Sequence, residues 1–126
     1  MAHMTREEVI KIVEVALEDA QDPDLRGANL KGLNLSSVSL KYANLRGAEL
    51  SSANLKDANL KYANLRGADL SSANLKGAKL ERSSLREVSL VGANLAASDL
   101  SGADMKGTNL QGVNLEGADL DGVKLR

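Results

Sequence analysis

A leucine at every fifth position is the feature that most constrains this chain. Leucine occupies each multiple of five from Leu25 to Leu125, except at Met105, which is apolar and of similar size. A period of five fits neither an α-helix nor a flat strand. It fits a chain that bends after each short extended step, so the period indicates a repeat architecture.

A longer repeat of twenty residues contains four of the short ones. Residues 41–60 read KYANLRGAELSSANLKDANL and residues 61–80 read KYANLRGADLSSANLKGAKL, with three differences between them. Four five-residue sides that close a square form one coil of twenty residues. Residues 24–126 therefore predict roughly five coils, which form a rod about 25 Å long at the usual strand spacing.

The inside of such a rod is narrow, and the sequence supplies side chains that fit it. The central leucine of each pentapeptide, and the small residue two before it, are expected to point inward. The predicted core includes Leu25, Leu30, Leu45, Leu65, Leu85, Met105 and Leu125. Glycine often follows two residues after the central position, at a corner where positive φ suits a tight turn. Where Tyr42, Asp57, Tyr62, Arg82 or Glu87 replaces glycine, we expect the turn type to vary.

The pentapeptides ANLRG, ADLSS, ANLKG, SDLSG, VNLEG and ADLDG resemble the A(D/N)LxG pattern of the pentapeptide-repeat family. The resemblance covers residues 24–126. It implies an all-β solenoid, a right-handed, four-sided parallel β-helix. It also implies that the C-terminal end is a place where such proteins dimerise, and that some members imitate B-form DNA and bind DNA gyrase.

Two short segments precede the repeats. Residues 1–4, MAHM, are typical of an expression scar, and because His3 lies there we assign it no function. Residues 5–23 predict an amphipathic helix, opened by a Thr5/Glu8 capping box and ended by Asp22-Pro23. We expect this helix to cap the first coil, since an open coil end exposes leucines and strand edges. The alternative is a helix that binds a partner or a second copy.

Composition and spacing bear on several function classes. The chain has no cysteine, a formal net charge of −1 and no long apolar run, so we expect a cytoplasmic protein with no disulfide and no membrane contact. No carboxylate has a nucleophile, a base or a phosphate-binding loop beside it in register. We therefore predict no enzyme, no cofactor and no catalytic or metal-binding residue. The Asn or Asp before each central residue is expected to form hydrogen bonds locally at the turn.

Residues twenty apart should stack in columns on the outer faces. One column forms a candidate interaction stripe: Arg26, Arg46, Arg66, Arg86, Lys106 and Arg126. The stripe predicts either an anion-binding surface or a solvated face that discourages edge pairing. A second column is a candidate aromatic ladder of Tyr42, Tyr62 and Arg82. It predicts a cation–π contact site or, as we prefer, a surface ladder that stiffens the rod.

The leading hypothesis is a non-catalytic scaffold or protein-interaction module with an unknown protein partner, able to form a homodimer through its uncapped C-terminal coil. The near-identical coils also suit a consensus-designed or engineered sequence. A DNA mimic that binds gyrase or topoisomerase needs an acidic rod, whereas residues 24–126 carry fourteen Lys/Arg and eleven Asp/Glu, a net charge of +3. A further alternative is weak polyanion binding through the basic column, although nucleic acid is not the expected partner.

Overall fold

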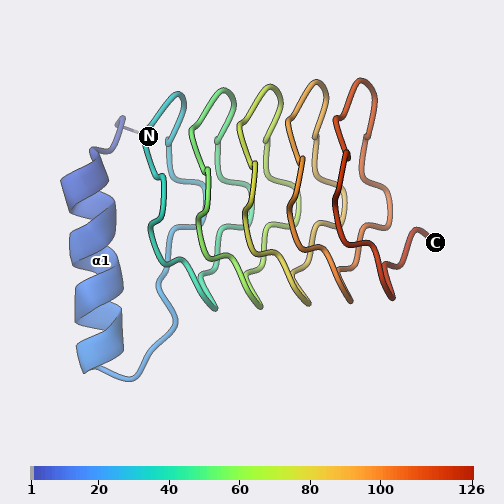
Figure 1. The fold of residues 1–126 in the computed structure, drawn as a ribbon. Coiled ribbons are helices and arrows are strands. Elements are labelled where there is room, and N and C mark those ends of the chain that lie inside the picture. Colours follow the sequence, from blue (N-terminus) through green and yellow to red (C-terminus); the bar gives the residue numbers. More distant parts are fainter. Residues whose placement is uncertain (1) are drawn as a thin grey trace.

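The computed structural model describes residues 2–126; Met1, part of the predicted expression scar, lies outside the described residues. Its helix, α1, spans Arg6–Glu18 (Figure 1). The helix begins with a capping box, in which Glu8 N–H donates to Thr5 Oγ1 (3.1 Å) and Thr5 N–H donates to Glu8 Oε1 (3.0 Å). Acidic side chains in the first turn also favour this start.

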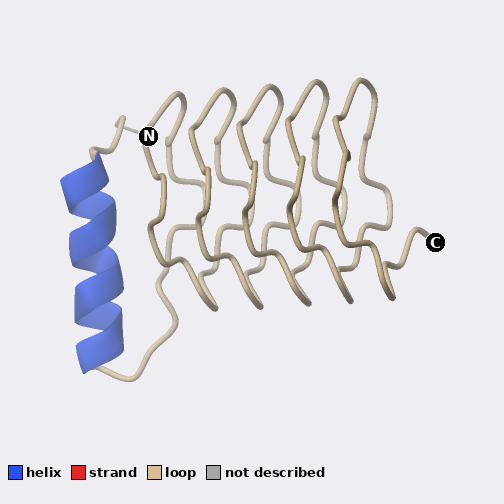
Figure 2. Cartoon of the chain, in the orientation of Figure 1, coloured by secondary structure: helices blue, strands red, loops and turns tan. Residues whose placement is uncertain are grey.

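The rest of the chain winds into a rod of stacked coils, and α1 lies across one end of it (Figure 1). Parallel bridges join residues twenty apart, from Asp24–Asn44 to Asp104–Lys124. Each contact is a single bridge rather than an extended strand, so the coils are drawn as loop in Figure 2. Isolated bridges arise because most of each five-residue side belongs to a turn.

Leucines stacked along the axis form the core of the rod. Leu25, Leu30, Leu45, Leu65, Leu85 and Met105 are at most 2% exposed. Burial of one such side chain contributes about 1.5–3 kcal/mol of transfer free energy. Leu125, which the sequence placed in the core, is 59% exposed. That assignment is wrong, because no coil of the described chain stacks on the outer side of the last one.

The corners share one backbone conformation whatever residue occupies them. Gly47 has φ +66°, and Tyr42 and Glu87 have φ of +64° and +61°. Each corner closes with the same kind of hydrogen bond, such as Ala43 N–H to Leu40 O at 3.0 Å. The expectation that the turn type varies is therefore wrong. Coil closure requires one turn, and it holds non-glycine residues in the left-handed region despite a cost of about 1 kcal/mol each.

The Asn or Asp before each central residue forms local hydrogen bonds, as expected. Asn44 Oδ1 accepts from Arg46 N–H at 3.2 Å, and Asn64 Oδ1 accepts from Arg66 N–H at 3.1 Å. Such side chains are committed to the turn. Among residues 2–126, no helix has the length and apolar character needed to cross a membrane.

Candidate interaction surfaces

The candidate interaction stripe is partly neutralised by carboxylates of neighbouring columns. Backbone hydrogen bonds such as Gly47 N–H to Arg66 O (3.0 Å) stack its residues coil upon coil. Three members form ion pairs. Arg26 contacts Asp24 at 2.9 Å, Arg66 contacts Glu87 at 3.1 Å, and Arg86 contacts Asp104 at 3.9 Å. These pairs are largely solvent-exposed, so each adds little stability, but together they reduce the positive field of the stripe.

The pair at the start of the stripe has the best geometry. Arg26 Nε donates to Asp24 Oδ1 and Arg26 Nη2 donates to Asp24 Oδ2, both at 2.9 Å. These bonds, with the Arg26 backbone N–H, hold the pKa of the Asp24 carboxyl below its ordinary value and raise the pKa of Arg26. Within residues 2–126, Arg46, Lys106 and Arg126 form no ion pair, so the unpaired charges of the stripe are Arg46 and the consecutive Lys106 and Arg126 rather than a continuous anion track.

The candidate aromatic ladder joins two of its three members. The rings of Tyr42 and Tyr62 stack with centroids 5.0 Å apart and planes 6° apart. The cation over this pair is Lys41, whose Nζ lies 5.4 Å from the centroid of Tyr42. No cation–π contact joins Arg82 to Tyr62 in the part of the chain that the structure describes. The stack therefore forms a short, exposed aromatic surface beside Lys41.

The N-terminal end of the rod presents carbonyl oxygens that no preceding coil can bind. On each side of a coil, the carbonyl groups of the residues immediately before and after the central leucine point toward the preceding coil. Inside the rod these accept N–H groups, as when Leu45 donates to Asn64 O (2.7 Å) and Gly47 donates to Arg66 O (3.0 Å). In the first coil, this pair of acceptors must find donors from the N-terminal segment or from solvent.

Arg6 and His3 supply donors on two sides of that end. Arg6 Nη1 donates to Asn34 O (2.9 Å) and Nη2 donates to Ser36 O (3.2 Å). On the adjacent side, Met4 N–H donates to Asn29 O (3.1 Å), and His3 Nε2 lies 2.8 Å from Lys31 O. Since a carbonyl only accepts, this contact is a hydrogen bond when the His3 ring carries a hydrogen on Nε2. The predicted expression scar thus contacts the first coil.

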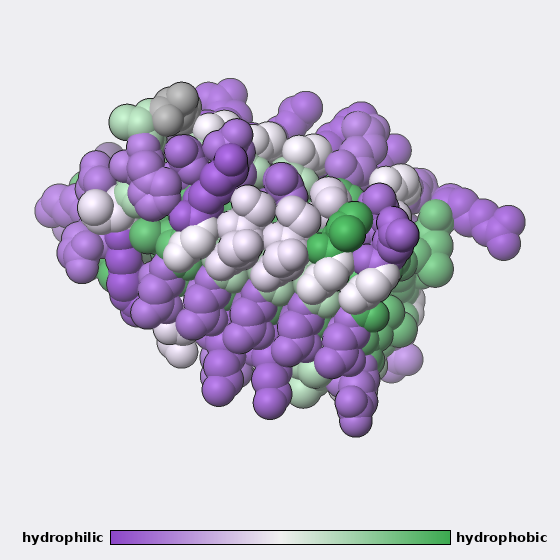
Figure 3. All heavy atoms as spheres, turned by 90° about the horizontal axis from the view of Figure 1, so that it is seen from above, coloured by the Kyte–Doolittle hydropathy of each residue, from purple (hydrophilic) through white to green (hydrophobic). Residues whose placement is uncertain are grey.

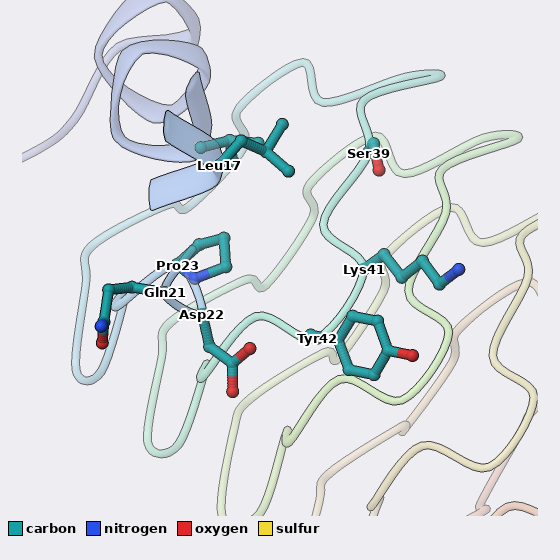
Figure 4. A pocket seen from close by; sticks show the side chains of 8 residues that line it. Leu17, Gln21, Asp22, Pro23, Ser39, Lys41 and Tyr42 are labelled. Atoms are coloured by element: carbon teal, nitrogen blue, oxygen red, sulfur yellow. The ribbon is translucent and has the colours of Figure 1, made fainter. Parts of the chain in front are cut away.

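A pocket of about 300 Å³ lies between the C-terminal part of α1 and the first coil (Figure 4). Leu17 projects from the helix, Asp22 and Pro23 come from the following loop, and Lys41 and Tyr42 come from the coil. Leu17 is 74% exposed, unusual for a leucine so close to a core. The remaining lining residues are Val13, Gln21 and Ser39.

The C-terminal end of the rod is open and apolar. A hollow of about 180 Å³ there is lined by Met105, Leu110, Leu115, Leu120, Val123 and Leu125. Figure 3 shows apolar atoms at the end of the molecule that carries the C-terminus. Backbone N–H groups of the last coil also lack an acceptor within residues 2–126, among them those of Leu110, Leu115 and Leu120. The equivalent N–H of Leu90 donates to Asn109 O at 2.9 Å.

Neither the role of Arg6 nor the pocket beside α1 was predicted from the sequence. The signal for Arg6 was present, since the carbonyls of the first coil that point away from the next coil need donors, and Arg6 lies in the first turn of α1. The pocket depends on the path of the loop from α1 into the first coil, and the five-residue period does not encode that path. Among the described residues, no group of three or more His, Asp and Glu side chains is placed to hold a metal ion.

Comparison with known proteins places the repeats in a family. The model for pentapeptide repeats matches eight copies, over residues 21–57, 48–87 and 89–126. Alr5209, a pentapeptide repeat protein from Nostoc PCC 7120, is 35% identical with a TM-score of 0.78, covering 94% of this chain and 95% of its own. A search of curated proteins finds no match.

HetL, a pentapeptide repeat protein involved in heterocyst differentiation regulation in Nostoc sp. strain PCC 7120, is also 35% identical with a TM-score of 0.78. The match covers 82% of this chain and 49% of HetL, so this chain spans about half the length of that protein. QnrB1, a plasmid-mediated fluoroquinolone resistance protein, is 25% identical with a TM-score of 0.39, covering 86% of this chain and 68% of QnrB1. The likeness to Alr5209 and HetL implies a right-handed β-helix, and the chain belongs to the pentapeptide-repeat family.

Proposed function

We propose that this chain is a non-catalytic scaffold and protein-interaction module, and that it pairs with a second copy of itself through its C-terminal coil. The observation that carries the proposal is the open apolar end, where Leu120 and Leu125 are 44% and 59% exposed. Exposed apolar clusters of this kind mark contact surfaces in soluble proteins.

The backbone of the last coil suits a second copy. Unpaired N–H groups such as that of Leu115 alternate with outward carbonyls along each side, as on the edge of a sheet. Two such edges related by a two-fold axis run antiparallel and can exchange hydrogen bonds. The opposite end does not offer this surface, because α1 lies across it and Val9 of the helix is fully buried.

The finer features of the fold belong to the same proposal. We take α1 as a cap on a rod of about five coils, with the hydrophobic core of the rod ending at Val9. A cytoplasmic location stays a prediction from the sequence.

Light scattering during size-exclusion chromatography tests the pairing. The wild-type chain should elute with the mass of a dimer, and the double variant Leu120→Lys, Leu125→Lys should elute as a folded monomer. A matched variant in α1 at the opposite end of the rod, Leu17→Lys, should remain dimeric. If the wild-type chain is a monomer even at high concentration, that result contradicts the proposed contact.

The gyrase alternative has less support. A DNA mimic needs a negative rod, and residues 24–126 carry a net charge of +3. In a gyrase supercoiling assay with a low-salt DNA-binding control, we expect no inhibition. Inhibition without DNA binding would support the DNA-mimic alternative over ours, whereas a shift in the DNA control alone would point to the interaction stripe.

A further inference from the structure

The guanidinium of Arg6 takes the place of two backbone N–H groups. Inside the rod, the carbonyls before and after a central residue accept from two separate N–H donors of the preceding coil. At the first coil, Asn34 O and Ser36 O accept from Nη1 and Nη2 of one arginine, at 2.9 and 3.2 Å. The planar fork of arginine therefore matches the spacing of this acceptor pair.

The same acceptor pair recurs on the next side of the coil, at Ser39 O and Lys41 O. One coil further, the equivalent carbonyls accept from Leu40 N–H (to Asn59 O, 2.7 Å) and Tyr42 N–H (to Lys61 O, 2.9 Å). Their direction therefore places Ser39 O and Lys41 O on the face toward α1. No hydrogen bond to either oxygen is found among residues 2–126, and both residues line the pocket beside α1 (Figure 4).

The surroundings of this acceptor pair favour a cation with an apolar stem. The pocket lies at the C-terminal end of α1, where the helix dipole is negative and the last turn of the helix carries no basic residue. Asp22 adds a carboxylate, and residues 5–23 hold six acidic and two basic side chains. Val13, Leu17 and Pro23 supply apolar walls of the kind that a hydrocarbon stem covers.

We propose that this pocket binds an arginine side chain presented by an extended peptide segment of a partner protein. The guanidinium donates to Ser39 O and Lys41 O, as Arg6 does to Asn34 O and Ser36 O. Its stem packs on Leu17 and Pro23, and Asp22 balances its charge. The Lys41 ammonium, which lies 5.4 Å from the centroid of the Tyr42 ring, opposes binding.

Two blocked tripeptides, acetyl-Gly-Arg-Gly-amide and acetyl-Gly-Lys-Gly-amide, test the proposal by NMR titration of the ¹⁵N-labelled full chain. The arginine peptide should produce saturable shifts at the amides of residues 21–22 and 39–42. The lysine peptide should bind at least about threefold more weakly, because an ammonium cannot span two carbonyls as a fork. Equal binding of the two peptides would reduce the site to simple charge attraction and overturn the proposal.

Variants with opposite expected effects sharpen the test. Asp22→Asn should weaken the arginine peptide about two- to fivefold, and Lys41→Met should strengthen it by a similar factor. Asp19→Asn, which removes a nearby carboxylate that does not line the pocket, is the matched control and should change little. Unchanged affinity in Asp22→Asn, or shifts centred on residues 24–26 instead, would contradict the assignment.

The site lies at the end of the rod opposite to the proposed dimer contact. The monomeric double variant Leu120→Lys, Leu125→Lys should therefore bind the arginine peptide as the wild type does. The outcomes of the two proposals can thus be distinguished in one set of proteins.

Discussion

Arg6 Nη1 lies 2.9 Å from the carbonyl oxygen of Asn34, which joins α1 directly to the backbone edge of the first coil. The adjacent nitrogen, Nη2, reaches Ser36 O at 3.2 Å, so one side chain satisfies two acceptors of that edge. Together with the burial of Val9, this contact fixes how α1 lies on the rod.

Replacing Arg6 by alanine should lower the free energy of unfolding by about 1–2 kcal/mol, because two charge-assisted hydrogen bonds at a partly exposed edge are lost. Arg6→Lys should recover only part of the loss, since an ammonium cannot donate to both oxygens with the same geometry. Urea denaturation measures the change. Lys11→Ala, an exposed basic residue on the same helix, is the control, and an equal loss there would contradict the assigned role.

Replacing Ser83 by alanine should stabilise the protein by about 1 kcal/mol, because its buried hydroxyl would no longer need a partner. Ser83 Oγ has no hydrogen-bond partner among residues 2–126, in an inward position that neighbouring coils fill with alanine. Ser98 is the matched control, since its hydroxyl donates to Leu95 O at 2.7 Å. Ser98→Ala should therefore bring less stabilisation or a net loss. Equal gains from both variants in thermal unfolding would argue against this explanation.

Exchanging glycine and non-glycine residues at the corners should change stability in opposite directions. Ser52→Gly should stabilise, and Gly47→Ala should destabilise, each by up to about 1 kcal/mol, because both corners have positive φ. Gly47 has open space where a side chain would stand, so the loss of stability in Gly47→Ala would come from backbone strain alone. Denaturation midpoints that move in the same direction for both variants would contradict a shared left-handed corner.

Replacing Asp99 by asparagine should reduce the dependence of stability on pH in the acidic range. Hydrogen bonds from the Ser101 hydroxyl and backbone N–H lower the pKa of Asp99 from 3.8. A carboxyl with a lowered folded-state pKa adds stability above its unfolded pKa, and this stability is lost as the pH falls through the folded value. The urea midpoint of the wild type should thus decline below about pH 4.5 more steeply than that of Asp99→Asn. Parallel curves would show that Asp99 makes no such contribution.

Much of the architecture followed from the sequence, because the period of five is repeated often enough to override local preferences. Inward positions such as Leu65 and local bonding by residues such as Asn64 could be assigned from one pentapeptide and extended to the rest. The ends could not be assigned in this way. Leu125 occupies the same central position of its pentapeptide as Leu65, but no coil within residues 2–126 covers it.

The outer surface was harder still to predict. Column stacking placed Arg66 and Arg86 on one face, but it did not reveal that Glu87 and Asp104 reach across from other columns to pair with them. The role of Arg6 depends on the angle between α1 and the first coil, which is set by tertiary packing rather than by the repeat.

Hydrogen exchange at the Leu115 amide tests most directly whether the C-terminal coil pairs with a second copy. Leu95, whose N–H donates to Asn114 O at 2.8 Å inside the rod, is the internal reference. If two copies pair, protection at Leu115 should rise with protein concentration toward that of Leu95, and it should be absent in the Leu120→Lys, Leu125→Lys variant. Fast exchange at Leu115 at every concentration, with Leu95 protected, would contradict the proposed pairing.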